Sequence, residues 1–508
     1  MADSAAVAEL VAEKRKLKKS LFRFDMIFFT VCAIVALDTI GASSAGGPQA
    51  LFWLGVSAIT FLIPYGLITA ELGAAFPTEG ATYDWVRLAY GHFAGAVVGV
   101  LYWLSNPIWL GGTLTAGAIA AFDALWGTHL GGNIVPEMIV AFLFIWVAVG
   151  MNILSLRYMK WVPNLGAIVR LALISLFAVV VILSAVQGNL KGSLNGFFPP
   201  LDSTFPVVLI GVLSVIVFQW IGFELQTNAS EEMENPQRDI PRAVYASGLI
   251  SFLGYAIPIG GIIVVLSADK LSGVSGFVSA YQSAVSGSLG GAATFFNYLV
   301  GAAFVFVLLS SGTTWLMGSD RLMAIGALAG SGPKQLGYFS STFGTPIVVN
   351  ILSGVVATFF MVLALTLTSG NLGAFFTVVL GLVISTTTFS YILIFPALIT
   401  LRRKYPNVAR PFVVPGGNAG AWVCVVLTVF WVSAATVFSL WPGLFTSTWS
   451  ADHANLSRLN FELANGIAIA ALVVLAIIFW AVGRAHAIHT GPITAATTAM
   501  PAAAPSGD

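Results

Sequence analysis

The first long apolar run of the chain is interrupted by the sequence Asp38-Thr39-Ile40-Gly41-Ala42-Ser43-Ser44-Ala45-Gly46-Gly47-Pro48. This mixture of a carboxylate, small residues and a proline disfavours a regular helix. A later apolar run is interrupted in a similar way, by Phe218-Gln219-Trp220-Ile221-Gly222-Phe223-Glu224. The dipeptide Ile-Gly occurs in both stretches, at 40–41 and at 221–222. The sequence therefore predicts two helices that are broken in the middle.

The composition of the whole chain indicates the solvent in which these helices fold. Of its 508 residues, 58% are hydrophobic and 8% are charged, whereas about a quarter of the residues of a soluble domain are charged. We therefore expect an all-α membrane protein in a lipid bilayer. The formal net charge of +1 argues against nucleic acid as a partner. Cys32 and Cys424 stand alone in apolar runs, so we predict no disulfide, no metal and no cofactor.

Apolar runs long enough to cross a membrane recur along the chain. A hydrocarbon core of about 30 Å needs roughly 20 residues of helix. The runs are continuous and do not alternate, as the strands of a membrane barrel would. We identify about twelve spans, with approximate limits at 26–48, 51–76, 93–122, 136–156, 161–187, 205–228, 242–267, 290–326, 345–368, 371–401, 421–442 and 464–483.

The basic residues predict how these spans are oriented. Cytoplasmic loops carry the excess of Lys and Arg, and with the N-terminus inside only Lys191, Lys270 and Arg458 fall on the outer side. Both termini are therefore predicted to be cytoplasmic, in a multi-pass protein of the plasma (inner) membrane. The N-terminal segment lacks the apolar core of a cleavable signal. The Ala/Thr/Pro-rich end that follows Thr490 favours disorder.

The two breaks indicate a binding site between them. Matching broken helices are expected of secondary transporters with inverted repeats, in which freed backbone groups bind the substrate. Free N–H groups at Ala42, Ser43 and Ser44 would suit a carboxylate, and free carbonyls from Phe218 to Ile221 would suit an ammonium group. The candidate substrate-binding residues are Ile40, Gly41, Ala42, Ser43, Ser44, Ala45, Gly46, Asn106, Phe218, Trp220, Ile221, Gly222, Phe223 and Glu224.

Three longer motifs lie between residues 70 and 346. One continues from Gly222-Phe223-Glu224 to Glu231-Glu232-Met233-Glu234-Asn235-Pro236-Gln237-Arg238-Asp239-Ile240-Pro241. Another runs from Ala70-Glu71-Leu72 through Phe76-Pro77-Thr78-Glu79-Gly80 to Tyr83-Asp84-Trp85, and a third is Gly318-Ser319-Asp320-Arg321 followed by Gly332-Pro333-Lys334. Together they resemble the amino acid–polyamine–organocation (APC) superfamily of permeases, whose signature after the sixth span reads GFE to EE-x-x-NP-x-R-x-IP.

The resemblance implies the LeuT-type fold, a 5+5 inverted repeat with helices 1 and 6 interrupted and two additional C-terminal helices. One motif departs from the family, which usually has G-S-G-I-x-G where this chain has Gly41-Ala42-Ser43-Ser44-Ala45-Gly46. Small residues are kept, so a carboxylate still fits there. The predicted division is a basic tail at 1–24, repeats at 25–190 and 200–404, two helices within 415–483 and a disordered tail at 484–508.

Four ionisable residues are predicted at membrane depth, where each costs roughly 2.5–3.5 kcal/mol and requires a reason. They are Asp38, Glu71, Arg170 and Glu224. Glu71 lies near the inner end of its span, where it can reach water or an arginine of an inner loop. For Glu224 the resemblance implies gating, substrate contact or proton carriage. A structural cap on the broken helix is the alternative.

Arg170 resembles a lysine that proton-coupled members of the family often place on the fifth helix, where it replaces a sodium ion. An arginine cannot release its proton in a protein. We therefore predict a fixed cation between the first break and the eighth helix, paired with Asp38, while Glu224 carries the proton. The alternative is a side chain that extends to the inner interface. The remaining coupling candidates are the hydroxyls of Ser310, Ser311 and Thr313.

Other functions find less support in the sequence. No Asp-x-Asp pair and no nucleotide-binding Gly-x-x-x-x-Gly-Lys-Ser/Thr motif occurs, and neither a channel filter nor the loop motif of the major facilitator class is evident. Asn106 either faces the cavity or holds helices together. We predict a secondary transporter of amino acids or related small amines, working by alternating access with proton symport or exchange. A polyamine antiporter is the alternative, and a membrane-embedded enzyme a remote one.

Overall fold

The computed structural model describes residues 2–17, 21–154, 160–200, 205–271, 276–288, 290–444 and 457–488. Within these ranges the protein is nearly all helical, and the one β-type contact is an isolated bridge between Leu21 and Met233. The prediction of an all-α protein is confirmed. The predicted disordered end after Thr490 lies outside the described residues.

Ten of the predicted spans form helical segments that are long and apolar enough to cross a membrane. Their limits differ from the predicted limits by a few residues, which is the usual uncertainty of helix ends. The segments are α4 (Gln49–Ser57) with η1 (Ala58–Leu62) and α5 (Ile63–Ala75); α7 (His92–Trp109) with η2 (Leu110–Leu114) and α8 (Thr115–Trp126); α9 (Ile134–Ile153); α11 (Trp161–Val186); α13 (Pro236–Val265); α15 (Ala293–Gly326) with η6 (Ala327–Ser331); α16 (Ile347–Leu367); α17 (Leu372–Ile394) with α18 (Ala397–Lys404); α19 (Gly417–Leu440); and α20 (Arg458–Gly483) with η10 (Arg484–His486).

The other two predicted spans are broken helices. The first consists of α2 (Arg23–Ile34) and α3 (Ile40–Ser44), separated by residues 35–39. The second consists of α12 (Phe205–Gln219) and the 3-10 helix η3 (Leu225–Glu232), separated by residues 220–224. Both interruptions fall in the runs where the sequence predicts them, and the second includes the predicted glycine, Gly222.

The first break begins earlier than the sequence predicts. Residues 41–44 are helical, and the Ser43 N–H donates to the Thr39 carbonyl at 3.1 Å. The hydroxyls of Ser43 and Ser44 also donate to carbonyls four residues back, a bond that serine makes readily inside a helix. The prediction of free N–H groups at Ser43 and Ser44 is therefore wrong, because one short turn of helix satisfies them.

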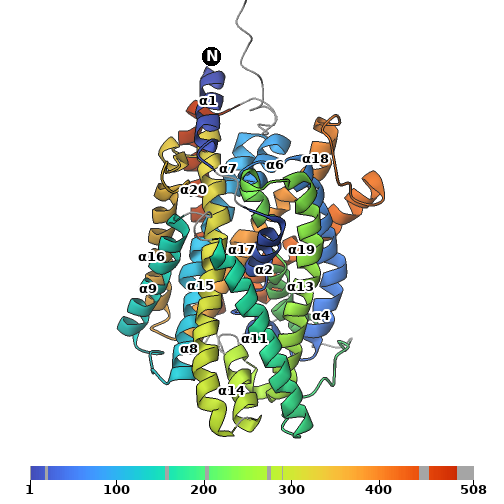
Figure 1. The fold of residues 1–508 in the computed structure, drawn as a ribbon, viewed down its shortest axis with the longest axis vertical. Helices are drawn as coiled ribbons and strands as arrows, with labels where there is room; N and C mark the ends of the chain where they lie inside the picture. Colours follow the sequence, from blue (N-terminus) through green and yellow to red (C-terminus); the bar gives the residue numbers. More distant parts are fainter. Residues whose placement is uncertain are drawn as a thin grey trace, which may run out of the picture.

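Among the described residues, three further α-helices were not expected from the sequence. They are α1 (Ala2–Lys14), α6 (Ala81–Tyr90) and α14 (Gly276–Ser288), each shorter than a membrane span. Helix α1 lies within the predicted basic tail at 1–24, and it packs against η6. Helix α14 lies at the opposite end of the bundle from α1 (Figure 1).

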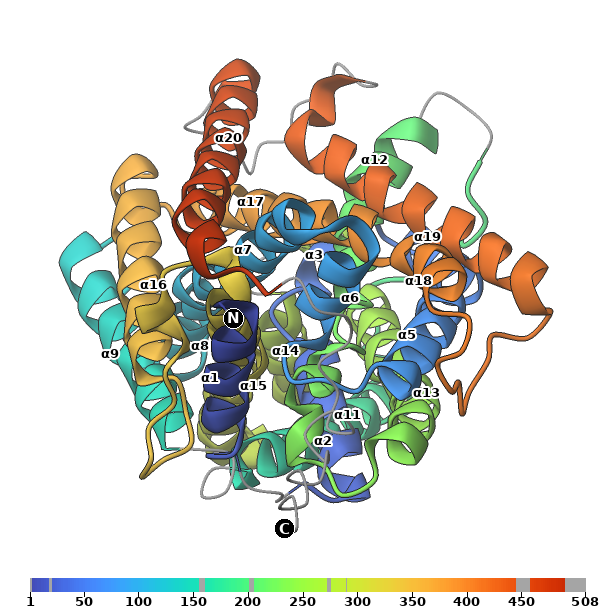
Figure 2. The same cartoon turned by 90° about the horizontal axis from the view of Figure 1, so that it is seen from above.

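The packing of the helices is that of two related halves. Three spans of the first half pack against their counterparts in the second: α5 meets α13, α7 meets α15 and α9 meets α16. Contacts between non-equivalent spans also come in matching pairs: α11 packs on α15 as α17 packs on α7, and α2 packs on α11 as α12 packs on α17. This pairing is expected of a 5+5 inverted repeat. Helices α19 and α20 lie on the outside (Figure 2).

Candidate functional site

The two breaks lie directly against each other in the centre of the bundle. Gly222 has a φ of 139°, and a Cβ added to it would lie 2.9 Å from Ile34 Cγ1 and 3.2 Å from Trp315 Cζ2. Ile34 is the last residue of α2, so the second break touches the point where the first begins. A residue with a side chain is strained at this φ and lacks the space.

Replacement of Gly222 by alanine is therefore expected to destabilise the protein by about 1–3 kcal/mol and to reduce substrate binding. Thermal unfolding and ligand binding would be measured on the purified full chain. Gly211→Ala is the matched control, because Gly211 also lies in the sixth span but has open space at its Cβ position. An equal loss in both variants would contradict the close approach of the breaks.

Glu224 follows Gly222 and is held by hydroxyl groups from three different spans. Its carboxylate accepts hydrogen bonds from Tyr65 on α5, Tyr391 on α17 and, at 2.7 Å, Tyr102 on α7. The Tyr65 hydroxyl also accepts from the Gly222 and Phe223 N–H groups at 2.9 and 3.1 Å. Backbone donors freed by the break are thus joined to the carboxylate through one hydroxyl. Glu224 is fully buried.

The first break has its own aromatic partners. The Tyr255 hydroxyl donates to the Ile34 carbonyl at 2.5 Å and accepts from the Ala36 N–H at 2.9 Å. Trp315 Nε1 donates to the Ala33 carbonyl at 2.9 Å. Side chains from α13 and α15 therefore replace hydrogen bonds that α2 loses where it ends, as a break inside a membrane requires.

Asp38 lies in the first break and faces the third span. Its Oδ2 accepts from Trp109 Nε1 at 3.0 Å and from Thr113 Oγ1 at 2.7 Å. Its Oδ1 has no hydrogen-bond partner among the described residues, although Asp38 is only 2% exposed. A buried carboxylate oxygen of this kind can accept a donor from a ligand.

Gln219 links the two breaks from the other side. Its amide nitrogen donates to Ser43 Oγ at 2.6 Å and to Thr39 Oγ1 at 3.2 Å. The last residue of α12 is thereby bonded to both ends of the first turn of α3. The break residues at 35–41 and 219–224 are all buried, so this structure is closed around the centre.

Arg170 occupies the predicted place between the first broken helix and the eighth span. Its guanidinium donates to the Val31 and Val307 carbonyls, each at 3.3 Å, and to Ser311 Oγ. The predicted ion pair with Asp38 is wrong: among the described residues none joins the two, because Asp38 is bonded to α7 and η2 instead. The alternative of an extended side chain is also wrong, since Arg170 is fully buried.

The comparisons with known proteins agree with this architecture. Residues 21–453 match the family model described as amino acid permease. The chain belongs to the amino acid permease family. A probable agmatine/putrescine antiporter of Lactococcus lactis is 29% identical over 84% of this chain and 89% of its own length. A branched-chain amino acid permease of Bacillus subtilis is 24% identical over 81% and 87%. An uncharacterized transporter of Legionella pneumophila is 29% identical over 79% and 85%.

Membership of the permease family confirms the predicted class of the protein. The family and the named relatives are transporters and not enzymes. The protein is therefore a multi-pass membrane permease for small molecules, of the superfamily that the motifs indicate.

Four predicted site residues of this permease form hydrogen bonds with their own helix or with another span. Thr313 and Asn106 donate to the carbonyls of Leu309 and Tyr102 on their own helices, at 2.9 and 2.8 Å. Trp220 Nε1 donates to Ser57 Oγ in α4 at 2.9 Å. Ser310 is near Arg170 but donates to the Val307 carbonyl on its own helix.

The remaining candidates line the breaks or pack beside them. Phe218 meets Trp109 edge-on, with ring centroids 6.1 Å apart. The Phe218 carbonyl accepts from the Ile221 N–H at 3.1 Å, so the prediction that it is free is wrong. Phe223 is buried beside Tyr65.

The small residues of the first break pack closely. A Cβ on Gly46 would lie 2.2 Å from Val212 Cγ1, so Gly46 allows contact with α12. Ile40 and Gly41 are buried, Ala42 is half-buried and Ala45 is exposed.

The sequence reasoning missed the aromatic hydroxyls and Gln219. Tyr65, Tyr102, Tyr255 and Tyr391 stand within apolar runs, where a packing role is the default reading. A signal existed, because a hydroxyl at membrane depth requires a partner. The sequence does not say which partner, since Glu224 and Tyr391 are separated by 167 positions.

Glu71 and the motif residues beyond the breaks form ion pairs. Glu71 pairs with Arg402 at 2.5 Å and Arg410 at 3.5 Å, which confirms the alternative of an arginine partner. Arg321 lies between two carboxylates, Glu232 at 2.8 Å and Glu79 at 3.4 Å. We call Arg321, Glu79 and Glu232 the Arg321 cluster. It joins the end of η3 to α15 and to the loop after α5.

The Arg321 cluster predicts a dependence of stability on pH. Burial, followed by the charge of Glu232, raises the pKa of Glu79 well above its ordinary value of 4.5, and burial raises the pKa of Glu232. A carboxyl whose pKa is raised by folding stabilises the protein below its ordinary pKa and loses that contribution as pH rises through the raised value.

Glu79→Gln is therefore expected to raise the melting temperature relative to the unmodified protein by about 2 °C at pH 8, and by less at pH 5. Thermal unfolding across this pH range measures the difference. Glu234→Gln is the control, because Glu234 is an exposed carboxylate in the same region. If the melting temperatures of Glu79→Gln and the unmodified protein differ by the same amount at every pH, the raised pKa of Glu79 is refuted.

Proposed function

We propose that this permease moves amino acids or related small amines across the plasma membrane by alternating access, driven by proton symport or by substrate exchange, with both termini in the cytoplasm. The observation that carries the proposal is the position of Glu224. It lies in the second break, adjacent to the first, and three hydroxyls from three spans hold it. A substrate bound between the breaks would sense the protonation of this carboxylate through the same hydrogen bonds.

The chemistry of the breaks favours an amino group over other substrate groups. Glu224 and Asp38 place two carboxylates on the two breaks, and Asp38 Oδ1 is available to a donor. The rings of Trp109, Phe218 and Trp315 lie next to one another and offer faces to a cation. A carboxylate finds fewer partners, because Ser43 already bonds within α3 and to Gln219.

The two carboxylates at the breaks also support a second candidate function, which is the exchange of amines that carry more than one positive charge. Two buried carboxylates suit two cationic groups better than they suit a zwitterion. One relative is a probable agmatine/putrescine antiporter. In this reading Asp38 and Glu224 each bind one end of the substrate, and no carboxylate site is required.

The proton would be carried by Glu224. Its three tyrosine hydroxyls can donate to the ionised carboxylate or, after rotation of one hydroxyl, accept from the protonated carboxyl. Arg170 stays charged in both states. We propose that Arg170, which donates to Ser311, is a permanent cation that holds α2 against α15 while the second break moves.

The experiment is a binding screen followed by transport. Amino acids, polyamines and other small amines are added to the purified chain, and a rise in melting temperature identifies ligands of the folded state. Labelled hits are then tested for uptake and for exchange in proteoliposomes. Recovery of the chemically unchanged labelled compound inside the proteoliposomes supports transport. The chemical class of the compounds that bind decides between amino acids and polyamines. Binding without uptake or exchange would overturn the proposal.

A further inference from the structure

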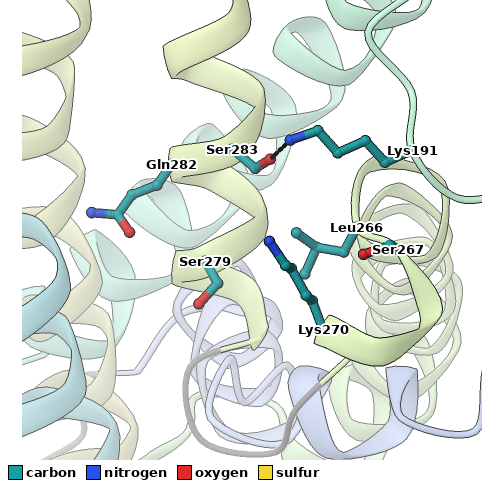
Figure 3. A pocket seen from close by; sticks show the side chains of 7 residues that line it. All are labelled: Lys191, Leu266, Ser267, Lys270, Ser279, Gln282 and Ser283. Atoms are coloured by element: carbon teal, nitrogen blue, oxygen red, sulfur yellow. Dashed lines mark hydrogen bonds between the residues drawn. The ribbon is translucent and has the colours of Figure 1, made fainter.

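A cavity lies away from the breaks (Figure 3), at the end of the bundle that carries α14 (Figure 1). It has a volume of about 620 Å³, a size that holds a small ligand. Its walls are the loop after α11, the end of α13, the short helix η4 (Ala268–Lys270) and α14. The lining residues are Lys191, Leu266, Ser267, Lys270, Ser279, Gln282 and Ser283.

The charge of this cavity is positive. Lys191 and Lys270 come from different segments and both extend toward α14 (Figure 3). Lys191 Nζ donates to Ser283 Oγ at 3.3 Å. Among the lining residues whose side chains the structure describes, none is acidic, so none of them gives the two ammonium groups a counter-charge. Two cations in one cavity repel each other, and an anion between them removes that cost.

The hydrogen-bonding groups of the cavity are mainly donors or hydroxyls. An ammonium group has three donors and no acceptor, and a hydroxyl can donate to an oxyanion. Gln282 donates with its amide nitrogen to the Ala124 carbonyl, which fixes α14 to the end of α8. The hydroxyls of Ser279 and Ser283 are therefore presented by a helix that is held in place.

We propose that this cavity is an anion site, which binds a carboxylate or phosphate group. The group can belong to a free anion or to the headgroup of a lipid, because both present the same oxyanion. The site is distinct from the breaks, but α14, which lines it, also packs on α3. A Cβ on Gly276, at the start of α14, would lie 2.6 Å from Gly41 Cα. An anion that orders α14 therefore also stabilises the packing of α14 on α3.

The test measures the melting temperature of the full chain in two settings. In non-ionic detergent, sodium phosphate or sodium acetate is compared with sodium chloride at equal ionic strength. In nanodiscs, phosphatidylcholine alone is compared with phosphatidylcholine containing phosphatidylglycerol. We expect the melting temperature to rise by about 3 °C in at least one of the two settings, because a ligand that binds the folded state raises it. A rise in detergent identifies a free anion, and a rise in nanodiscs alone identifies a lipid phosphate.

The variant Lys191→Gln/Lys270→Gln should lose this rise. Both lysines are exposed, so the variant is expected to fold. Lys270→Arg should keep the rise because it keeps the charge. Arg458→Gln is the control, since Arg458 pairs with Glu462 and does not line the cavity. A rise that persists in the double variant, or no rise in either setting, would overturn the anion site.

Discussion

Glu224→Gln is expected to reduce the rate of proton-driven uptake by about two orders of magnitude, while substrate exchange continues. The amide has nearly the shape of the carboxylate and its oxygen can accept from the tyrosine hydroxyls, but it cannot bind and release a proton. Tyr102 and Tyr391 donate to the same carboxylate oxygen, so both keep an acceptor when the amide oxygen takes that position. Tyr65, which donates to the other oxygen, then faces the amide nitrogen and accepts from it instead. Uptake driven by a pH gradient and exchange without a gradient would be measured in the same proteoliposomes.

Glu137→Gln is the matched control for this variant. Glu137 is a buried carboxylate in another span, α9, where it accepts from the Gly132 N–H at 2.9 Å, and its loss should reduce both activities little. Equal loss of uptake and exchange in Glu224→Gln, with the protein folded, would mean that Glu224 binds substrate or shapes the break. Retention of proton-driven uptake would exclude it as the carrier.

Arg170→Lys is expected to keep transport within about tenfold and to add a pH dependence near neutrality. A buried lysine can lose its proton in this range, whereas arginine cannot. When the lysine is neutral, the carbonyls of Val31 and Val307 lose the charge that holds α2 against α15. Transport should therefore fall as the pH rises, and initial uptake rates from about pH 6 to 8.5 measure the change.

The control for this variant is Arg410→Lys. Arg410 is a half-buried arginine that pairs with Glu71 and not with a residue of either break, so its replacement should not change the pH profile. Identical profiles for Arg170→Lys and the unmodified protein would contradict the role of Arg170 as a fixed cation. Complete inactivity at every pH would instead indicate that the bidentate shape of the guanidinium is required.

Much of the fold could be predicted because the membrane imposes strict rules. Apolar runs of a fixed length give the spans, and the interruptions near Gly41 and Gly222 stand out against them. The motif around Glu224 then indicates the family. The exact place of the first break could not be predicted, because residues 41–44 suit either a loop or one turn of helix, and contacts with Tyr255 and Gln219 decide between them.

The site could be predicted only in part. Charged residues at membrane depth identified Asp38, Arg170 and Glu224, since each requires a reason to be there. Their partners could not be predicted, because they come from spans far away in the sequence. The simplest rule, pairing of opposite charges, failed for Asp38 and Arg170. Two backbone carbonyls and a hydroxyl accept from the terminal nitrogens of Arg170, and Trp109 and Thr113 donate to one oxygen of Asp38.

The most direct measurement is a structure of the full chain with a transported ligand bound. We expect the ligand between residues 35–41 and 219–224, with its amino group within hydrogen-bonding distance of Asp38 or Glu224, and with at least one tyrosine hydroxyl displaced from the Glu224 carboxylate. A transported ligand bound elsewhere, with both breaks closed as they are here and all three tyrosines still on Glu224, would contradict the account.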